Sequence, residues 1–112
     1  MQDKMIEKWD QEIEAIHKKL AEVGPMRPGT LSRQYHKPAE QEGGYWQLSY
    51  THLRRSYTEH VREEELKEVR GQLEEYRKFK ELSVGWVDLA LQRARRLRQL
   101  KRRKPGAPGN SR

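Results

Sequence analysis

The feature that most constrains this chain is a narrow apolar stripe, at helical spacing, in a segment that is otherwise charged. Between residues 3 and 23 the large apolar side chains are separated by three and four positions in alternation. This pattern predicts an amphipathic helix with a single seam that suits packing against another helix. Gly24 and Pro25 end the helix, because proline cannot continue it. The residues of the seam are Ile6, Trp9, Ile13, Ile16, Leu20 and Val23.

Composition explains why the fold must depend on packing between such stripes. The chain has 112 residues, of which 33% are hydrophobic and 37% charged, and it contains no cysteine. Too few apolar residues are present for a large core, so the chain needs apolar helix stripes, a partner chain, or both. Disulfides, thiolate zinc sites and cysteine nucleophiles are excluded. No apolar run reaches the ~20 residues of a membrane span, and the start of the chain lacks the apolar region of a secretory signal. We therefore expect a cytoplasmic protein without a membrane partner.

The middle of the chain predicts a connector followed by a hairpin. Residues 24–44 hold three of the five prolines and four of the eight glycines, which is typical of a loop. Residues 45–61 are rich in Tyr, Thr, Ser and Val and predict two antiparallel strands with a turn near residues 52–54. Two registers remain open, in which paired residue numbers sum to 105 or to 107. Both registers place the same five apolar or aromatic residues on one face, namely Trp46, Leu48, Tyr50, Tyr57 and Val61.

Residues 62–104 predict a second helical region, with a break or kink plausible near Gly85. Glutamates lie at its start and Arg and Lys at its end, which suits the helix dipole. We expect the N-terminal seam to pack against the Leu66–Tyr76 stripe, and the hairpin face to cover part of that pair. The prediction is an α+β fold forming one small domain over residues 1–104, with coiled-coil-like helix packing and a disordered tail over residues 105–112. We also expect a homodimer.

The basic end of this helix is the strongest functional signal. The net charge is +7, no acidic residue follows Asp88, and residues 1–92 have a net charge of −2. At 100° per residue, five arginines cover the side opposite Leu97 and Leu100, where they could lie along a phosphate backbone. We expect this side to be solvated and to have few acids nearby. The five are Arg95, Arg96, Arg98, Arg102 and Arg103. A solvated basic helix end and a membrane-surface helix are the alternatives. The predicted nucleic-acid-binding residues are Arg93, Arg95, Arg96, Arg98, Lys101, Arg102, Arg103 and Lys104.

Two further groups of cations could extend this surface. The connector offers hydroxyl groups together with Arg27, Arg33 and Lys37, a mixture that suits phosphate or base-edge contacts. At the hairpin tip, Arg54 and Arg55 could enter a groove, since a two-stranded ribbon fits the major groove. An ordinary polar connector is the alternative for the first group.

The chain shows no pattern of an active site or a metal site. The four histidines do not form an HxxxH or HxH pair, and no Asp or Glu lies at a recognisable ligand spacing. No nucleophile elbow and no phosphate-binding glycine pattern occurs. We expect a protein without enzymatic activity, cofactor or metal. The histidines are His17, His36, His52 and His60.

Three stretches carry a resemblance to a known family. They are RPGTLSRQY (residues 27–35), YWQLSYTH (45–52) and YRKFKELSVGWVDLA (76–90). With them, residues 5–98 resemble a family of small bacterial proteins that are often encoded beside transposable elements. Typical members carry a cysteine cluster before the first strand, where this chain has HKPAEQEGG. The resemblance implies a mobile-element setting and no particular biochemical activity.

These observations predict a nucleic-acid-binding accessory protein of a mobile genetic element, which contacts backbone phosphates through its C-terminal helix. DNA and RNA both remain open as ligands. The alternative is a protein–protein adaptor that engages a larger partner, such as a transposase or nuclease, and uses the basic segment only to steer encounter.

Overall fold

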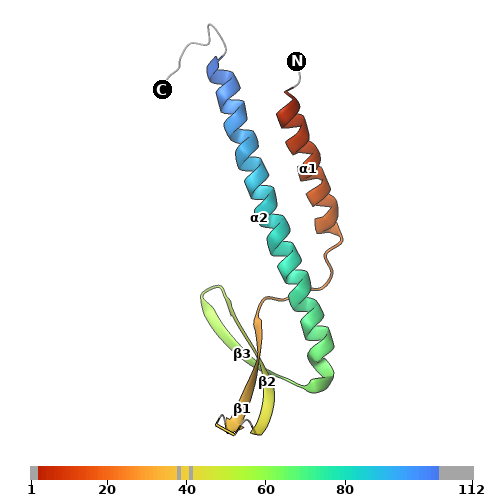
Figure 1. Ribbon diagram of the computed structural model, residues 1–112, viewed down its shortest axis with the longest axis vertical. Coiled ribbons are helices and arrows are strands. Elements are labelled where there is room, and N and C mark those ends of the chain that lie inside the picture. The colour runs from red at the N-terminus through yellow and green to blue at the C-terminus, as the bar shows by residue number, and fades with distance from the viewer. Residues whose placement is uncertain (1–2, 38, 41, 104–112) are drawn as a thin grey trace. The chain divides into compact units, whose positions relative to one another are not determined.

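The computed structural model describes residues 3–37, 39–40 and 42–103. The elements follow the order α1 (Lys4–Ala21), β1 (Thr30–Lys37), β2 (Glu42–His52), β3 (Arg55–Val61), a single 3-10 turn (Glu63–Glu65) and α2 (Leu66–Arg103), as Figure 1 shows. The predicted α+β class is therefore confirmed. The predicted disordered tail, residues 105–112, lies outside the described residues.

The chain forms two compact units, and each contains part of α2. Unit 1 combines the N-terminal segment up to Glu22 with the chain from Glu81 onward, and unit 2 is Val23–Lys80. The single domain expected for residues 1–104 stays a prediction.

The sheet of unit 2 has three strands where two were predicted. Its order is β1-β2-β3 and all pairs are antiparallel. The predicted connector was wrong over residues 30–37, which form β1 and pair with β2 through Leu31↔Leu48 and Arg33↔Trp46. Residues 30–37 contain no proline or glycine, and an added strand pairs the free edge of a hairpin that would be marginal by itself.

The β2–β3 hairpin has the second of the two predicted registers. Trp46 pairs with Val61 and His52 with Arg55, so paired numbers sum to 107. The two residues between the strands, Leu53 and Arg54, have φ of 51° and 69°. Positive φ at both central positions is the geometry of a tight two-residue hairpin turn.

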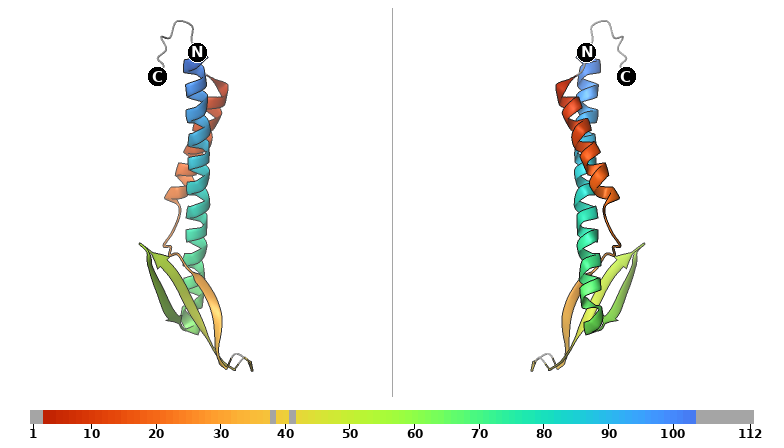
Figure 2. Two further views of the ribbon diagram at one scale, coloured as in Figure 1. Left: turned by 90° about the vertical axis from the view of Figure 1, so that its left-hand side faces the viewer. Right: turned by 90° about the vertical axis from the view of Figure 1, so that its right-hand side faces the viewer.

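The core lies between one face of this sheet and the start of α2. Four of the described residues are buried, namely Leu48, Val61, Leu66 and Val69, and Leu31, Trp46, Tyr50 and Leu73 pack against them. The predicted apolar face of the hairpin is thus confirmed. Figure 2 shows the sheet beside the first turns of α2.

The prediction that the N-terminal seam packs on the Leu66–Tyr76 stripe was wrong. The sheet covers Leu66, Val69 and Leu73, and α1 belongs to the same unit as the helix from Glu81 onward. The connector explains this result. The Gly24 amide donates to Glu75 Oε1 at 2.8 Å, and the Arg27 amide donates to the Gln72 carbonyl at 3.2 Å. These bonds hold the start of the connector beside Gln72 and Glu75 of α2, and the sheet packs on the early stripe.

No break occurs near Gly85, because α2 continues from Leu66 to Arg103. A Cβ added at Gly85 would meet Ile16 Cδ1 at 3.7 Å, which is ordinary van der Waals contact. Close packing therefore does not require glycine at position 85. Glycine also destabilises the helix relative to alanine, because it loses more conformational entropy on folding.

We predict that Gly85→Ala raises the free energy of unfolding by about 0.5–1 kcal/mol, measured by urea denaturation followed by circular dichroism. Gly71→Ala is the matched control, since a Cβ there meets nothing within 4 Å. If Gly85→Ala lowers the free energy of unfolding while Gly71→Ala raises it, α2 is not a continuous, unstrained helix at Gly85.

We also predict that Leu48→Ala lowers the free energy of unfolding by about 2–5 kcal/mol. Leu48 is 0% exposed and lies at the centre of the core cluster. Val87→Ala is the control, because Val87 is 59% exposed. Equal losses in the two variants would show that the core is not centred on Leu48.

Candidate nucleic-acid interface

Four contacts pair α1 with the C-terminal part of α2 in unit 1. The rings of His17 and Trp86 meet edge to face with centroids 4.3 Å apart, and Ile16 lies against Gly85. Further along, Arg93 Nε bonds Asp10 Oδ1 at 2.5 Å. At the start of α1, both Nε and Nη2 of Arg96 bond Asp3 Oδ2, at 3.1 and 3.0 Å. The two helices are therefore antiparallel, with an apolar seam that ends in two ion pairs.

Asp3 links the ion pair to the helix start. Its Oδ1 accepts hydrogen bonds from the amides of Met5 and Ile6, at 3.0 and 3.1 Å, and so caps α1. The hydrogen bond from Arg96 holds the pKa of the Asp3 carboxyl below its usual range, and the amide of Ile6 adds to the effect. Arg93 has a raised pKa because of its hydrogen bond with Asp10.

The ion pairs divide the predicted basic surface into two sets. Arg93 and Arg96 point toward α1 and are half-buried, so the expectation that Arg96 lies on a solvated side with few acids nearby was wrong. Their acidic partners come from α1, which is distant in sequence. Four other cations are exposed and make no ion pair within the described residues: Arg95, Arg98, Lys101 and Arg102. Arg103 is the last helical residue, with its side chain outside the description, and Lys104 lies outside the described residues.

One face of α2 therefore changes from apolar to basic along its length. Val84, Val87 and Leu91 are 64%, 59% and 49% exposed, and they follow one another at intervals of three and four residues. Arg95, Arg98 and Arg102 continue the same spacing. Residues at this spacing share one side of a helix, and it is the side opposite the α1 seam.

The two arginines of the connector region are held against the body of unit 2. Arg27 Nη2 bonds Glu59 Oε1 at 3.2 Å, and its guanidinium lies 5.2 Å from the centre of the Tyr50 ring. Tyr50 donates a 2.8 Å hydrogen bond to Glu59, which lowers the pKa of Glu59 and raises that of Tyr50. Arg27 is thus part of a partly exposed polar cluster.

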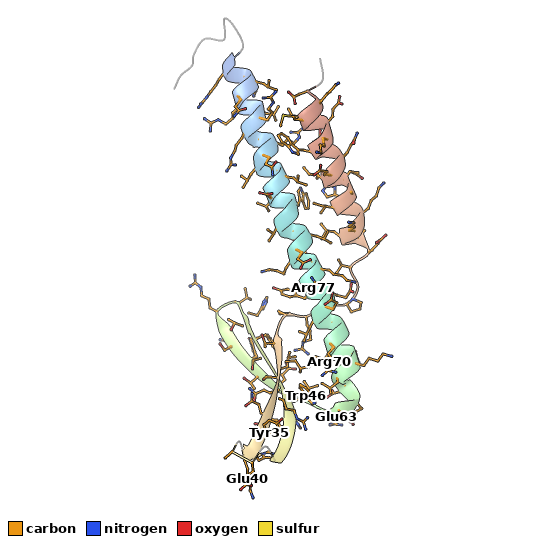
Figure 3. The ribbon with its side chains drawn as sticks, in the orientation of Figure 1. Tyr35, Glu40, Trp46, Glu63, Arg70 and Arg77 are labelled. Carbon is orange, nitrogen blue, oxygen red and sulfur yellow. The ribbon has the colours of Figure 1, made fainter. Side chains whose placement is uncertain are left out.

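Arg33 forms a second cluster around Trp46. The guanidinium groups of Arg33 and Arg70 lie 5.2 and 5.1 Å from the Trp46 ring centre. Glu63 Oε2 accepts a hydrogen bond from the Trp46 indole at 3.1 Å and lies 3.4 Å from Arg33 Nη1. Figure 3 shows Trp46, Glu63 and Arg70 together where the sheet meets the start of α2. A Cβ at Gly44 would come within 2.6 Å of the Arg33 guanidinium, so a larger residue there would displace the Arg33 side chain from its place beside Trp46.

The other three predicted site cations of unit 2 differ from Arg27 and Arg33. Lys37, Arg54 and Arg55 are exposed and form no ion pair among the described residues. Lys37 ends β1, whereas Arg54 and Arg55 belong to the β2–β3 turn and the start of β3. Of the three cations predicted for the connector, Arg27 and Arg33 are thus ion-paired, and their role in nucleic-acid binding stays a prediction.

The second face of the sheet was predicted in part, because alternation along the hairpin places Gln47, Ser49, Ser56, Thr58 and His60 together on one side, but the contribution of β1 was not predicted. Because side chains alternate along a strand, the register places eleven uncharged polar residues on the side away from α2, a surface that we term the polar face. None of them is buried. A row of three rings crosses it, with His36 5.0 Å and His60 5.6 Å from Tyr45. The polar face consists of Thr30, Ser32, Gln34 and His36 of β1, Tyr45, Gln47, Ser49 and Thr51 of β2, and Ser56, Thr58 and His60 of β3.

No family model, curated protein or solved structure matches this chain. Within the described residues, no three His, Cys, Asp or Glu side chains gather in a way that could hold a metal ion. No helix in that part of the chain has the length and apolar character needed to cross a bilayer.

The Asp3–Arg96 pair predicts a pH dependence of stability. The folded pKa of Asp3 lies below its unfolded value of about 3.9, so the pair contributes stability above that pH and loses it as the pH falls through the folded pKa. Asn also caps helices well, so Asp3→Asn removes the charge while keeping a cap. We expect Asp3→Asn to lower the melting temperature near pH 7, and the difference from the parent to shrink below about pH 4.

The measurement is thermal unfolding from pH 7 to pH 2.5, with Glu7→Gln in the same helix as the control. A difference between Asp3→Asn and the parent that stays constant over this range would show that the ion pair adds nothing to the cap.

Proposed function

We propose that this chain is a non-enzymatic nucleic-acid-binding protein that contacts backbone phosphates through Arg95, Arg98, Lys101 and Arg102. The observation that carries the proposal is that these four cations are exposed and make no ion pair with any described residue, on a helix segment with no acidic residue after Asp88. Three of the four are arginines, whose guanidinium group bonds phosphate in a forked geometry.

The neighbouring ion pairs support this proposal by fixing the helix that presents the cations. Arg93 and Arg96 are bonded to Asp10 and Asp3, so α1 braces the basic segment along the seam while its opposite side stays open. The bracing lowers the conformational entropy lost on binding. The resemblance to proteins encoded beside transposable elements favours an accessory role in a mobile element, in the bacterial cytoplasm.

The test is binding at a series of salt concentrations, with the variant Arg95→Gln/Arg98→Gln/Lys101→Gln/Arg102→Gln. Each phosphate contact on duplex DNA contributes about −0.9 to the slope of log K against log salt. We therefore expect the variant to bind duplexes of any sequence more weakly and its slope to be flatter by about 3 to 4. Fluorescence anisotropy with a labelled 20-base-pair duplex measures both quantities.

A matched control removes the same charge elsewhere in unit 1. Lys4, Lys8, Lys18 and Lys19 of α1 are all exposed, and replacing them with Gln changes the net charge equally. If this control weakens binding as much as the α2 variant does, net charge and not the α2 surface determines the affinity.

The exposed apolar residues of α2 favour a second candidate, a protein–protein adaptor. Val84, Val87 and Leu91 form a stripe that is roughly half exposed or more, and a second copy or a larger partner could cover it. The predicted homodimer belongs to this candidate, and light scattering at micromolar concentration measures it. Failure to bind duplex DNA, single-stranded DNA and RNA at low salt would favour the adaptor.

A further inference from the structure

The polar face is unusual for a chain with this composition. Solvated faces of antiparallel sheets are polar, and in a chain with 37% charged residues such a face would be expected to carry several charges. All eleven positions are instead hydroxyl, amide, phenol or imidazole side chains. The absence of carboxylates from this face removes repulsion of phosphates. The side chains that are present are hydrogen-bonding groups of the kind that read base edges.

Two glutamines have the donor and acceptor pair that matches adenine. Gln34 Nε2 donates to Ser32 Oγ at 3.1 Å, and Gln47 Nε2 donates to Ser49 Oγ at 3.4 Å. Each amide keeps its second N–H and its oxygen without a partner in the described part of the chain. An N–H directed to N7 and an oxygen accepting from the N6 amino group form the bidentate pair by which glutamine recognises adenine.

The dimensions of the sheet fit one groove. Neighbouring strands lie about 4.8 Å apart, and the major groove of B-form DNA, about 12 Å wide, admits a two-stranded ribbon. The neighbouring strands β1 and β2, which carry Gln34 and Gln47, therefore fit this groove. The minor groove of DNA, about 6 Å wide, and the deep, narrow major groove of RNA do not admit such a face. No helix covers the polar face in unit 2 (Figures 1 and 2).

Cations that make no ion pair among the described residues lie at both ends of the sheet. Lys37 ends β1 at one end, and Arg54 and Arg55 lie at the β2–β3 turn at the other. At this turn Leu53 is 83% exposed and has a φ of 51°. A bulky residue in the left-handed region is strained, and strain of this kind gathers at functional sites. The charges suit phosphates on either side of a bound groove.

We propose that the polar face reads base edges in the major groove of duplex DNA, with Gln34 and Gln47 recognising adenine and Lys37, Arg54 and Arg55 contacting flanking phosphates. This inference rests on the proposed nucleic-acid-binding function, to which it adds DNA as the ligand and a source of sequence preference. The α2 cations supply affinity for any sequence, and the polar face discriminates between sequences.

The experiment is selection of bound duplexes from a library with a random 20-base-pair core, at a salt concentration where non-specific binding is weak. The full chain is expected to enrich a motif that contains adenine. Gln34→Ala/Gln47→Ala should lose at least tenfold of the preference for that motif over random duplex, as expected for two lost bidentate contacts. Its affinity for random duplex should stay within about threefold, since phosphate contacts carry no sequence information.

The matched control is Gln11→Ala/Gln99→Ala, which removes two exposed glutamines from the helices and should leave the preference unchanged. A second measurement needs no variant and so does not depend on folding. Replacing adenine in the selected motif with 7-deazaadenine removes the N7 acceptor and should lower the affinity of the parent protein about tenfold.

Each result decides between the two proposals. If the parent binds duplex DNA but enriches no motif, or if the glutamine variant and 7-deazaadenine have no effect, the reading role of the polar face is overturned and phosphate binding through α2 stands. Tighter binding to single-stranded DNA or to RNA than to duplex DNA also overturns it. If no nucleic acid binds, both proposals fail.

Discussion

The rest of the structure depends on how α2 shares its scarce apolar surface between two partners. Its first turns carry Leu66 and Val69, two of the four residues that are buried in the described part of the chain, and pack against the sheet. From Glu81 onward the same helix packs against α1. A chain with 33% hydrophobic residues cannot build one large core, and it builds two small contacts along one long helix instead. The sides of α2 that neither partner covers remain open for other contacts.

The arginines of α2 are also divided, between the side that faces α1 and the opposite side. Along the α1 seam of α2, Arg93 and Arg96 replace apolar residues and are neutralised by Asp10 and Asp3. On the opposite side Arg95 and Arg98 have no partner within the described residues. Exposed ion pairs contribute little stability singly, but Asp3 also caps α1, so its pair with Arg96 acts on the helix start as well. Adjacent arginines in one basic run thus differ in role because of helical geometry.

Helical spacing and strand alternation explain what the sequence could predict. The N-terminal helix, the hairpin faces and the α+β class follow from local periodicity, which needs no knowledge of distant contacts. Which elements pack against each other does not follow from local periodicity. The partner of α1 was wrongly assigned because both halves of α2 carry apolar stripes, and β1 was missed because proline and glycine on either side suggested a loop. One signal was present: Leu82, Trp86, Leu89, Arg93, Arg96 and Leu100 continue a single stripe at intervals of three and four, which places both arginines on the seam.

In our two proposals, affinity and sequence discrimination come from different elements. Phosphate contacts respond to salt and ignore sequence, and the cations suited to them lie on α2. Hydrogen bonds to base edges require uncharged donors and acceptors at fixed positions, and a paired three-stranded sheet holds side chains more firmly than a connector could. A loop over residues 24–44 would have offered Gln34 without fixing its position. By pairing with β2, β1 sets Gln34 opposite Tyr45 and turns a polar segment into one row of an ordered surface.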